Sequence, residues 1–380
     1  MNPGLHGGNR EAVARRLGCR PEQLLDASAS LVPFGPSPAL RRALKRLPLR
    51  LLRDYPDRDQ HDLRQAIASH HGLDPDWVLP GNGAAELFTW AARDAAAAGL
   101  SLLPAPGFAD YRRALACWQG AWRSLPLPLQ WADAGPGPLP LTLPDPPAAA
   151  VLWITNPHNP TGQLWSRAAL QSLLQRFALV IVDEAFLPLV PAGEAESLIP
   201  LLPDCPGLVV IRSLTKLHAI AGLRLGYALG EPARLARWAA WRDPWPLNGL
   251  ALALGPTLLA ERRWPERVRR WVAREEPWLR QRLAALPGLV PMPSAANFLL
   301  LRGEREGRRL DLEPLRLALE QRQRILLRGC RSFEGLDAGW LRIGLQERRG
   351  NVRLLRALAR ELAAAPPAEL AGRPPLSPAS

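Results

Sequence analysis

The hydrophobic pattern changes character along the chain. From about residue 60, amphipathic helical segments alternate with short runs that are almost continuously apolar. Such runs are typical of strands in a parallel sheet, because helices bury both faces of that sheet. The helical segments are LRQAIASHHG, ELFTWAARDAAAAG and LQSLLQRF, and the apolar runs are SLLPA, AAAVLWITN, ALVIVDEA and GLVVIRS. The middle of the chain is therefore predicted to be an α/β domain with a mainly parallel sheet.

A smaller α+β unit is predicted after this domain. An Arg- and Trp-rich helical pattern covers residues 257–285, and a helix at 312–323 and a last helix near residue 365 alternate with the strand-like segments NFLLLR, RILLR and WLRIGL. Before the large domain, two short helical patterns flank the loop SASLVPFGPS, which is typical of an arm that lies on a neighbouring surface. The predicted organisation is an arm at 1–40 that packs on the small domain and the active site, a large domain at 41–256 with an irregular connection at 125–147, a small domain at 257–365 and a disordered tail at 366–380.

The charge balance singles out one lysine. The net charge is +13, but the basic residues are spread as pairs along the chain instead of clustering with aromatic residues, so no nucleic-acid partner is expected. Only Lys45 and Lys216 are lysines among 48 basic residues. A guanidinium stays protonated and cannot act as a nucleophilic amine, so each lysine is a candidate for chemistry that arginine cannot perform. Lys45 lies in the amphipathic run RRALKR and is interpreted as a surface residue.

The cysteines and the apolar stretches indicate the compartment. The four cysteines are scattered with no pair at metal-ligand spacing, so we expect no metal site and a reducing environment. The N-terminal segment lacks the apolar core of a signal peptide. The longest weakly polar stretch, residues 247–260, is interrupted by Asn248 and Pro256. These features predict a cytoplasmic protein with no membrane partner.

Polar groups follow the apolar runs at the places where a parallel sheet carries its site. In open parallel sheets, ligands bind outside the carboxyl ends of the strands. Asp183 ends the run LVIVD, and Lys216 follows the run GLVVIR, so a carboxylate and an amine are predicted to face each other. Pyridoxal phosphate needs this pair, because a lysine holds its aldehyde and an acidic partner keeps its pyridine nitrogen protonated. Taken alone, Asp183 could be a helix cap or a loop carboxylate, and Lys216 could be a surface cation.

A phosphate site is predicted beside this pair. Ser213 and Arg224 flank Lys216 in the segment SLTKLHAIAGLRLG, and a hydroxyl, an amine and a guanidinium can surround one phosphate. The glycine-rich turn at 81–85 precedes the helical segment ELFTWAARDA, so its N–H groups and the positive end of the helix dipole favour the same anion. The turn by itself is a weak signal, and the combination is specific.

These segments together resemble the fold-type I pyridoxal-phosphate family, the aspartate-aminotransferase-like enzymes, from about residue 6 to residue 363. The resemblance implies pyridoxal 5'-phosphate as the cofactor and a homodimer as the assembly. By resemblance, Lys216 would hold the cofactor covalently, Asp183 would pair with its ring nitrogen, Asn159 would donate to its 3'-oxygen, and Phe108 would stack on its ring. The implied phosphate-binding residues are Gly83, Ala84, Ala85, Ser213, Arg224 and, from the other subunit, Tyr55.

Within the family, several segments resemble the threonine-phosphate decarboxylases of cobalamin synthesis, which are related to the histidinol-phosphate aminotransferases. The segments are HGGN at 6–9, LLDASAS at 24–30, PGFADY at 106–111, VDEAF at 182–186, RSLTK at 212–216, PWPLN at 244–248 and RILLR at 324–328. The resemblance implies a small anionic amino-acid phosphate as substrate, decarboxylated to 1-amino-2-propanol O-phosphate. Arg342 would bind the substrate carboxylate. The residues implied for the substrate phosphate are His6, Asn9, Ser30 and Arg328.

Three departures from the family pattern keep alternatives open. Ser30 and Val32 stand where asparagines are common, and Ala84 and Ala85 replace a turn that often carries a hydroxyl. Phe186 stands where aminotransferases usually have a tyrosine, which disfavours efficient transamination. Decarboxylation and transamination use the same groups, so an aminotransferase acting on histidinol phosphate or a related amino acid is the alternative. A catalytically idle scaffold protein is a third reading, which the intact set of cofactor residues disfavours.

Overall fold

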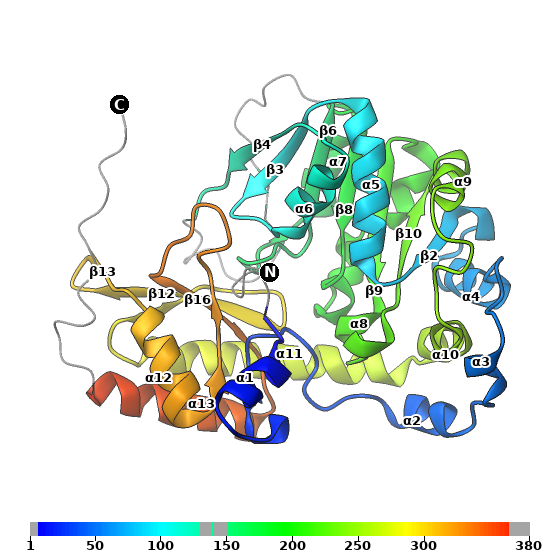
Figure 1. The fold of residues 1–380 in the computed structure, drawn as a ribbon. Helices are drawn as coiled ribbons and strands as arrows, with labels where there is room; N and C mark the ends of the chain where they lie inside the picture. The colour runs from blue at the N-terminus through cyan, green and yellow to red at the C-terminus, as the bar shows by residue number, and fades with distance from the viewer. Residues whose placement is uncertain (1–6, 130–137, 140, 142–149, 365–380) are drawn as a thin grey trace.

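The computed structural model describes residues 7–129, 138–139, 141 and 150–364. Two layered units stand side by side in Figure 1, and the long helix α11 (Arg263–Ala284) extends from the smaller unit toward the base of the larger one. The C-terminal tail and most of the proline-dense connection at 125–147 lie outside the described residues. No helix in the described ranges is both long and apolar enough to cross a membrane.

The larger unit is built on a seven-stranded sheet of order β2-β10-β9-β8-β6-β3-β4. β10 is antiparallel to both of its neighbours, and the other neighbouring pairs run parallel. The mainly parallel α/β fold predicted from the sequence is confirmed. The strands are β2 (Val78–Gly81), β3 (Ser101–Ala105), β4 (Trp122–Pro126), β6 (Val151–Thr155), β8 (Leu179–Asp183), β9 (Leu208–Ser213) and β10 (Gly226–Gly230).

Helices cover both faces of this sheet, and the pleat of β6 shows why its sequence is apolar throughout. Leu152 and Ile154 pack in one hydrophobic cluster, whereas Val151 and Trp153 pack in another on the opposite face. Since successive side chains of a strand alternate between faces, a strand buried on both sides needs apolar residues at every position. The helices are α4 (His61–His71), α5 (Ala84–Ala98), α6 (Asp110–Cys117), α7 (Arg167–Leu174), α8 (Leu214–Leu217), α9 (Pro232–Ala240) and α10 (Gly249–Ala260).

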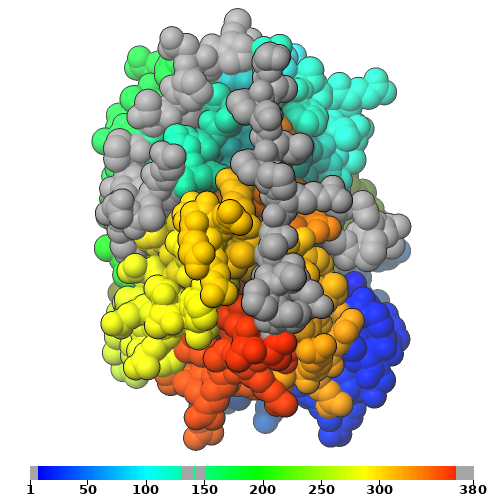
Figure 2. Space-filling model, turned by 90° about the vertical axis from the view of Figure 1, so that its left-hand side faces the viewer, coloured from blue at the N-terminus to red at the C-terminus, as the bar shows by residue number. Residues whose placement is uncertain are grey.

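The smaller unit contains an antiparallel sheet of order β11-β12-β16-β15, packed against three helices. Its helix α13 (red) lies at the outer face of the molecule in Figure 2, and the N-terminal arm (blue) lies at an edge of the same face. The strands are β11 (Leu289–Pro291), β12 (Phe298–Arg305), β15 (Arg328–Gly329) and β16 (Trp340–Gly344), with β13 (Arg308–Arg309) paired to β12, and the helices are α11, α12 (Glu313–Gln323) and α13 (Arg348–Ala364).

The arm packs on the smaller unit. Strand β1 (Leu25–Asp26) pairs in parallel with β14 (Ile325–Leu326), and Ala27 and Val32 join the hydrophobic core of the smaller unit. The remaining elements are α1 (Arg10–Arg16), α2 (Pro38–Lys45), α3 (Arg50–Arg53), the short strands β5 (Pro138–Leu139) and β7 (Leu164–Trp165), and the 3-10 turns η1 (Pro21–Gln23), η2 (Pro75–Trp77), η3 (Leu187–Leu189), η4 (Gly193–Glu196), η5 (Ile199–Asp204) and η6 (Ala221–Leu223).

The region expected to form one helix at 257–285 contains parts of two. Helix α10 ends at Ala260, and α11 begins at Arg263, so the expected boundary at 256/257 falls inside α10. Leu258 and Leu259 at the end of α10 pack in the core of the larger unit. The apolar residues that precede Arg263 therefore belong to the packing of the first unit, and the Arg- and Trp-rich helix of the second unit begins after them.

Candidate active site

A cavity of about 350 Å³ lies where the carboxyl ends of β6, β8 and β9 face the sheet of the smaller unit. It is lined by the lysine, the carboxylate and the phosphate-binding groups that the sequence predicts, and also by two arginines of the smaller unit. The predicted site residues that line it are Ser30, Gly83, Ala84, Ala85, Phe108, Asn159, Asp183, Ser213, Lys216, Arg224, Arg328 and Arg342.

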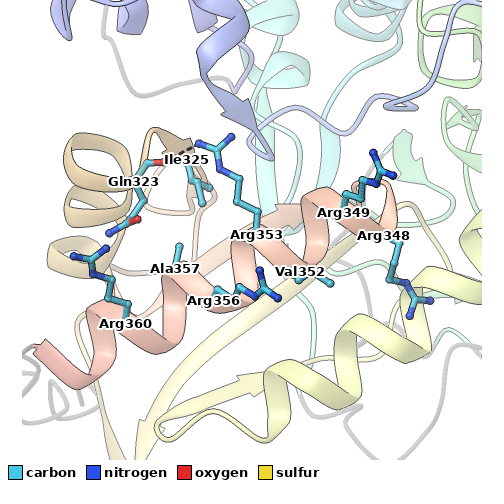
Figure 3. A pocket seen from close by; sticks show the side chains of 9 residues that line it. All are labelled: Gln323, Ile325, Arg348, Arg349, Val352, Arg353, Arg356, Ala357 and Arg360. Atoms are coloured by element: carbon cyan, nitrogen blue, oxygen red, sulfur yellow. Dashed lines mark hydrogen bonds between the residues drawn. The ribbon is translucent and has the colours of Figure 1, made fainter.

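A second hollow, of about 480 Å³, lies on the outer side of α13 and has a different character. Figure 3 shows arginines of α13 along this hollow, with Arg353 donating a hydrogen bond to the backbone oxygen of Gln323. Its described lining consists of arginines, one glutamine and small apolar side chains, with no amine or carboxylate among them. A guanidinium cannot form a bond with an aldehyde, so the larger hollow does not compete with the cavity at Lys216 as the site of chemistry.

Asp183 is held by two donors at the end of β8. The hydroxyl of Tyr111 donates to its Oδ2 at 2.6 Å, and the backbone N–H of Ala185 donates to its Oδ1 at 2.9 Å. Burial raises the pKa of Asp183 to about 6, while both donors and the nearby Lys216 act in the opposite direction. Both donors are neutral, so this buried carboxylate can still form an ion pair with a protonated pyridine nitrogen.

Lys216 lies in α8, directly after β9, and its side chain borders the cavity. Its pKa is lowered to about 8, first by burial and then by the positive charges of Arg342 and Arg224, and Asp183 opposes these effects. A larger fraction of the amine is therefore unprotonated near neutral pH than in an exposed lysine. An unprotonated amine is the form that can attack an aldehyde carbon.

The turn that is predicted to bind the phosphate requires glycine at position 83. Gly83 has a φ of 76°, and a Cβ built there would lie 2.5 Å from Nη2 of Arg224. The guanidinium therefore approaches the turn at the N-terminus of the 15-residue helix α5, where backbone N–H groups and the helix dipole favour an anion. Ser213 adds a hydroxyl, which lies 2.7 Å from the hydroxyl of Thr215. Donors from three segments thus line the same cavity, as the predicted phosphate site requires.

Arg342 contacts Asn159, which is predicted to bind the cofactor, and pairs with Arg328, which is predicted to bind the substrate. We call the part of the cavity lined by Ser30, Arg328 and Arg342 the substrate side. Its Nη1 donates to Oδ1 of Asn159, and its Nη2 donates to the backbone oxygen of Ser28 at 3.3 Å. Its Nε is buried and has no hydrogen-bond partner within the described residues. Burial lowers the pKa of Arg342 to about 10. The guanidinium thus has a buried donor to spare, as the predicted carboxylate anchor requires, and it fixes the amide oxygen of Asn159.

A second group of polar atoms lies on the substrate side. The hydroxyl of Ser30 is buried without a hydrogen-bond partner within the described residues. Arg328 is 6% exposed, and its Nη2 donates to Oγ of Ser332 at 2.6 Å. The arm reaches the same place, since Gly7 and Gly8 line the cavity and the N–H of Gly8 donates to Oγ of Ser28 at 3.0 Å.

Two predicted residues within the described ranges, Asn9 and Tyr55, do not line the cavity. The predicted residue His6 lies outside the described residues. Asn9 is exposed just before α1. Tyr55 is 79% exposed after α3, where its ring stacks on Trp245 with centroids 4.3 Å apart. Its position on the surface is compatible with the expected contribution to another subunit, and it makes no contribution to the cavity of its own chain.

Sequence reasoning assigned no role to Tyr111 or Phe333. Tyr111 lies in the segment PGFADY, but its contact with Asp183 joins residues 72 positions apart. Phe333 is buried, lines the cavity and lies near the guanidinium groups of both Arg328 and Arg342, with 5.5 and 6.0 Å from each Cζ to the ring centroid. It belongs to no strand or helix, so no periodic pattern marked it.

The residues present fit pyridoxal 5'-phosphate. The glycine turn leaves room that a Cβ would fill, Asp183 supplies a buried carboxylate for the ring nitrogen, and Lys216 supplies an amine. Phe108 lines the cavity and contributes an aromatic face. Each part of the cofactor, namely the phosphate, the ring nitrogen and the aldehyde, therefore has a matching group in the described site.

Comparison with known proteins agrees with this chemistry. The family model of class I and II aminotransferases matches residues 23–358. The chain is 38% identical over 330 residues to threonine-phosphate decarboxylase of Salmonella typhimurium, covering 83% of this chain and 86% of that protein. It is 32% identical over 294 residues to histidinol-phosphate aminotransferase of Chromohalobacter salexigens, covering 76% of this chain and 80% of that protein.

Solved structures show the same fold. L-threonine-O-3-phosphate decarboxylase from Porphyromonas gingivalis superposes with a TM-score of 0.77 at 25% identity, covering 90% of this chain and 100% of that one. Histidinol-phosphate aminotransferase from Sinorhizobium meliloti, in complex with pyridoxal-5'-phosphate, superposes with a TM-score of 0.79 at 23% identity, covering 94% and 95%.

The chain belongs to the class I and II aminotransferase family and has its aspartate-aminotransferase-like fold. It is a pyridoxal-phosphate-dependent enzyme, and pyridoxal 5'-phosphate is its cofactor. The predictions of the fold, the cofactor and the enzyme class are confirmed.

Proposed function

We propose that this enzyme removes the α-carboxylate of L-threonine O-3-phosphate and produces (R)-1-amino-2-propanol O-phosphate, a step of cobalamin biosynthesis. The observation that carries the proposal is a second set of polar groups in the cavity, which would suit a second anion. The buried guanidinium of Arg328 and the hydroxyl of Ser30, which has no hydrogen-bond partner among the described residues, line the cavity in addition to the groups predicted for the cofactor phosphate. The decarboxylases among the relatives bear the name of such a substrate.

The chain's own residues divide the work between binding and proton transfer. The bound cofactor supplies an electron sink for the bond that breaks. Arg342 holds the substrate carboxylate through its buried guanidinium, and Arg328 with Ser30 holds the phosphate, so two charged ends of the substrate fix its orientation. Asp183 maintains the charge of the ring nitrogen. The amine of Lys216, once freed, donates a proton from Nζ to the substrate Cα.

An aminotransferase acting on histidinol phosphate or a related amino acid is the second candidate. Relatives that bear this name are 32% identical to the chain, and the phosphate of their substrate would suit the same arginine. Phe186 lines the cavity where aminotransferases usually have a tyrosine, and this favours the decarboxylase.

The two reactions differ in their products. Incubation of the holoenzyme with L-threonine O-3-phosphate alone should release one carbon dioxide per molecule consumed, and the amine should remain on the product. An aminotransferase needs 2-oxoglutarate and produces glutamate instead. Glutamate formed from histidinol phosphate and 2-oxoglutarate, without release of carbon dioxide from threonine phosphate, would support the second candidate and reject the first.

We also propose that the enzyme works as a cytoplasmic homodimer. Large apolar side chains are exposed around α2 and α3, where the fold of one chain leaves them uncovered. Burial of this patch in a dimer would place Tyr55 against a second chain. Sedimentation analysis should give about twice the mass of one chain, and a monomer would reject the proposal. The exposed residues are Leu44 at 51%, Leu49 at 82%, Leu52 at 70%, Tyr55 at 79% and Trp245 at 37%.

A further inference from the structure

We propose that Arg112 is a positioning residue for the substrate phosphate. It lies on α6 in the larger unit, outside the cavity, and acts across the boundary between the units on the loop at 331–334 of the smaller one. The inference rests on the proposed second anion site, and it assigns a role to a residue that touches neither substrate nor cofactor.

Arg112 contacts the loop at two points. Its Nη1 donates to Oε2 of Glu334 at 2.9 Å, and its Nη2 donates to the backbone oxygen of Ser332 at 3.4 Å. Its guanidinium also lies over the ring of Trp122 in the larger unit, 5.6 Å from the centroid. Two contacts from one guanidinium fix the orientation of a short segment better than one contact does.

The loop in turn fixes the arginine of the second anion site. Oγ of Ser332 accepts a hydrogen bond from Nη2 of Arg328 at 2.6 Å. The ring of the next residue, Phe333, is buried near both guanidinium groups, with its centroid 5.5 Å from Cζ of Arg328 and 6.0 Å from Cζ of Arg342. The position of the loop therefore determines how the Arg328 guanidinium points, whereas the pairing of Arg328 with Arg342 across β15 and β16 sets the spacing of the two backbones.

Helix α6 then serves both ends of the cavity through neighbouring residues. Tyr111 donates to Asp183 on the cofactor side, and Arg112 holds the loop on the substrate side. Because the same helix carries both contacts, it fixes the distance between the substrate phosphate site and the carboxylate of Asp183. A substrate whose phosphate lies at the matching distance from its amine binds more tightly for this reason, and a substrate without a phosphate does not.

The exposure of the Arg112–Glu334 ion pair sets the expected loss of substrate affinity when Arg112 is removed. The side chains of Arg112 and Glu334 are 28% and 43% exposed, so solvent screens the ion pair. Screened pairs of this kind contribute modestly, and the loss of Arg112 should weaken binding of a phosphorylated substrate about threefold. Ser332→Ala removes the hydroxyl that accepts a hydrogen bond from the buried guanidinium of Arg328, so it should weaken binding of the phosphorylated substrate more, about tenfold.

The test is the affinity of the holoenzyme for L-threonine O-3-phosphate (O-phospho-L-threonine) and for L-threonine, measured from the initial absorbance change of the bound cofactor after rapid mixing. This change precedes turnover, so the result does not depend on whether the enzyme decarboxylates or transaminates. Arg112→Ala should lower the affinity for O-phospho-L-threonine about threefold, and it should leave the affinity for L-threonine and the retention of the cofactor unchanged. The double variant Arg112→Glu with Glu334→Arg should restore part of the loss, because the opposite charges again face each other.

Arg331→Ala is the matched control. Arg331 belongs to the same loop and carries the same charge, but it faces Asp311 within the smaller unit, at 3.8 Å. An equal effect of Arg112→Ala and Arg331→Ala, or an equal loss of affinity for both amino acids in Arg112→Ala, would overturn the inference. A decarboxylation test that fails while Arg112→Ala selectively weakens O-phospho-L-threonine would reject the proposed reaction and retain the positioning role.

Discussion

The hydroxyl of Tyr111 bridges Asp183 and Thr155, at 2.6 Å from Oδ2 of the carboxylate and 2.7 Å from Oγ1 of the threonine. The two partners lie on neighbouring strands, because Thr155 of β6 is in register with Asp183 of β8. Since Tyr111 donates its one hydroxyl proton to Asp183, the hydroxyl of Thr155 donates to Tyr111. A donor at this point favours the charged carboxylate, whereas burial favours the neutral acid. Tyr111 therefore helps to keep Asp183 in the form that pairs with a protonated ring nitrogen.

Tyr111→Phe should shift the acidic limb of the activity profile to higher pH. The tyrosine hydrogen bond lowers the pKa of Asp183, which burial raises to about 6. Removal of the bond raises this pKa further, so protonation and loss of activity begin at a higher pH, by roughly one unit. Tyr227→Phe is the control, because that hydroxyl is also buried but lies 2.9 Å from His71. Superimposable kcat profiles for Tyr111→Phe and the unmodified enzyme would refute this role.

Lys216 should react with the cofactor aldehyde with an apparent pKa near 8. Burial and two arginines lower its pKa to about 8, so the reactive amine accumulates as pH rises through this value. The rate of reconstitution of the apoprotein, followed by absorbance between pH 6 and 10, should level off above pH 9. Borohydride should fix the cofactor to the Lys216 peptide, and Lys216→Arg should lose activity. A label on Lys45, or a rate that still rises at pH 10, would exclude the assignment.

Gly83→Ala should lower the affinity for the cofactor by at least about tenfold. A side chain at position 83 is strained at a φ of 76°, and its Cβ would meet Nη2 of Arg224 at 2.5 Å, so the phosphate cradle must open. Gly222→Ala is the matched control near the same arginine, because a Cβ there meets nothing within 4 Å. Titration of each apoprotein with pyridoxal 5'-phosphate measures the difference. Equal affinities in the two variants would remove the turn from the phosphate site.

Arg342→Ala should raise the KM for an amino-acid substrate by one or more orders of magnitude. The loss of one partner from a buried, hydrogen-bonded charge pair costs roughly 2–5 kcal/mol, or about 30-fold and more. The variant also removes the donor to Asn159. Arg302→Ala is a control in the same sheet, since Arg302 pairs with Glu304 at 2.8 Å. Steady-state kinetics with an unchanged KM would exclude Arg342 as the carboxylate anchor.

The sequence predicted the parts of the fold that depend on local pattern. The apolar runs identified β6, β8 and β9, and the position of Asp183 and Lys216 after two of them placed both groups at one edge of the sheet. It gave no sign that β10 runs antiparallel, because apolar character does not encode strand direction. The short segment around Phe333 was also missed, since loop residues contribute to the cavity through contacts with distant parts of the chain.

The measurement that tests the account most directly is the rate of carbon dioxide release from L-threonine O-3-phosphate and from L-threonine, without a keto acid. A buried guanidinium and a phosphate form a strong, charge-assisted contact. The unmodified enzyme should therefore prefer the phosphorylated substrate by at least about 100-fold in kcat/KM, and Arg328→Ala should abolish most of the preference while it retains the cofactor. Equal release from both amino acids, or a variant that loses the cofactor and keeps the preference, would contradict the second anion site and the function built on it.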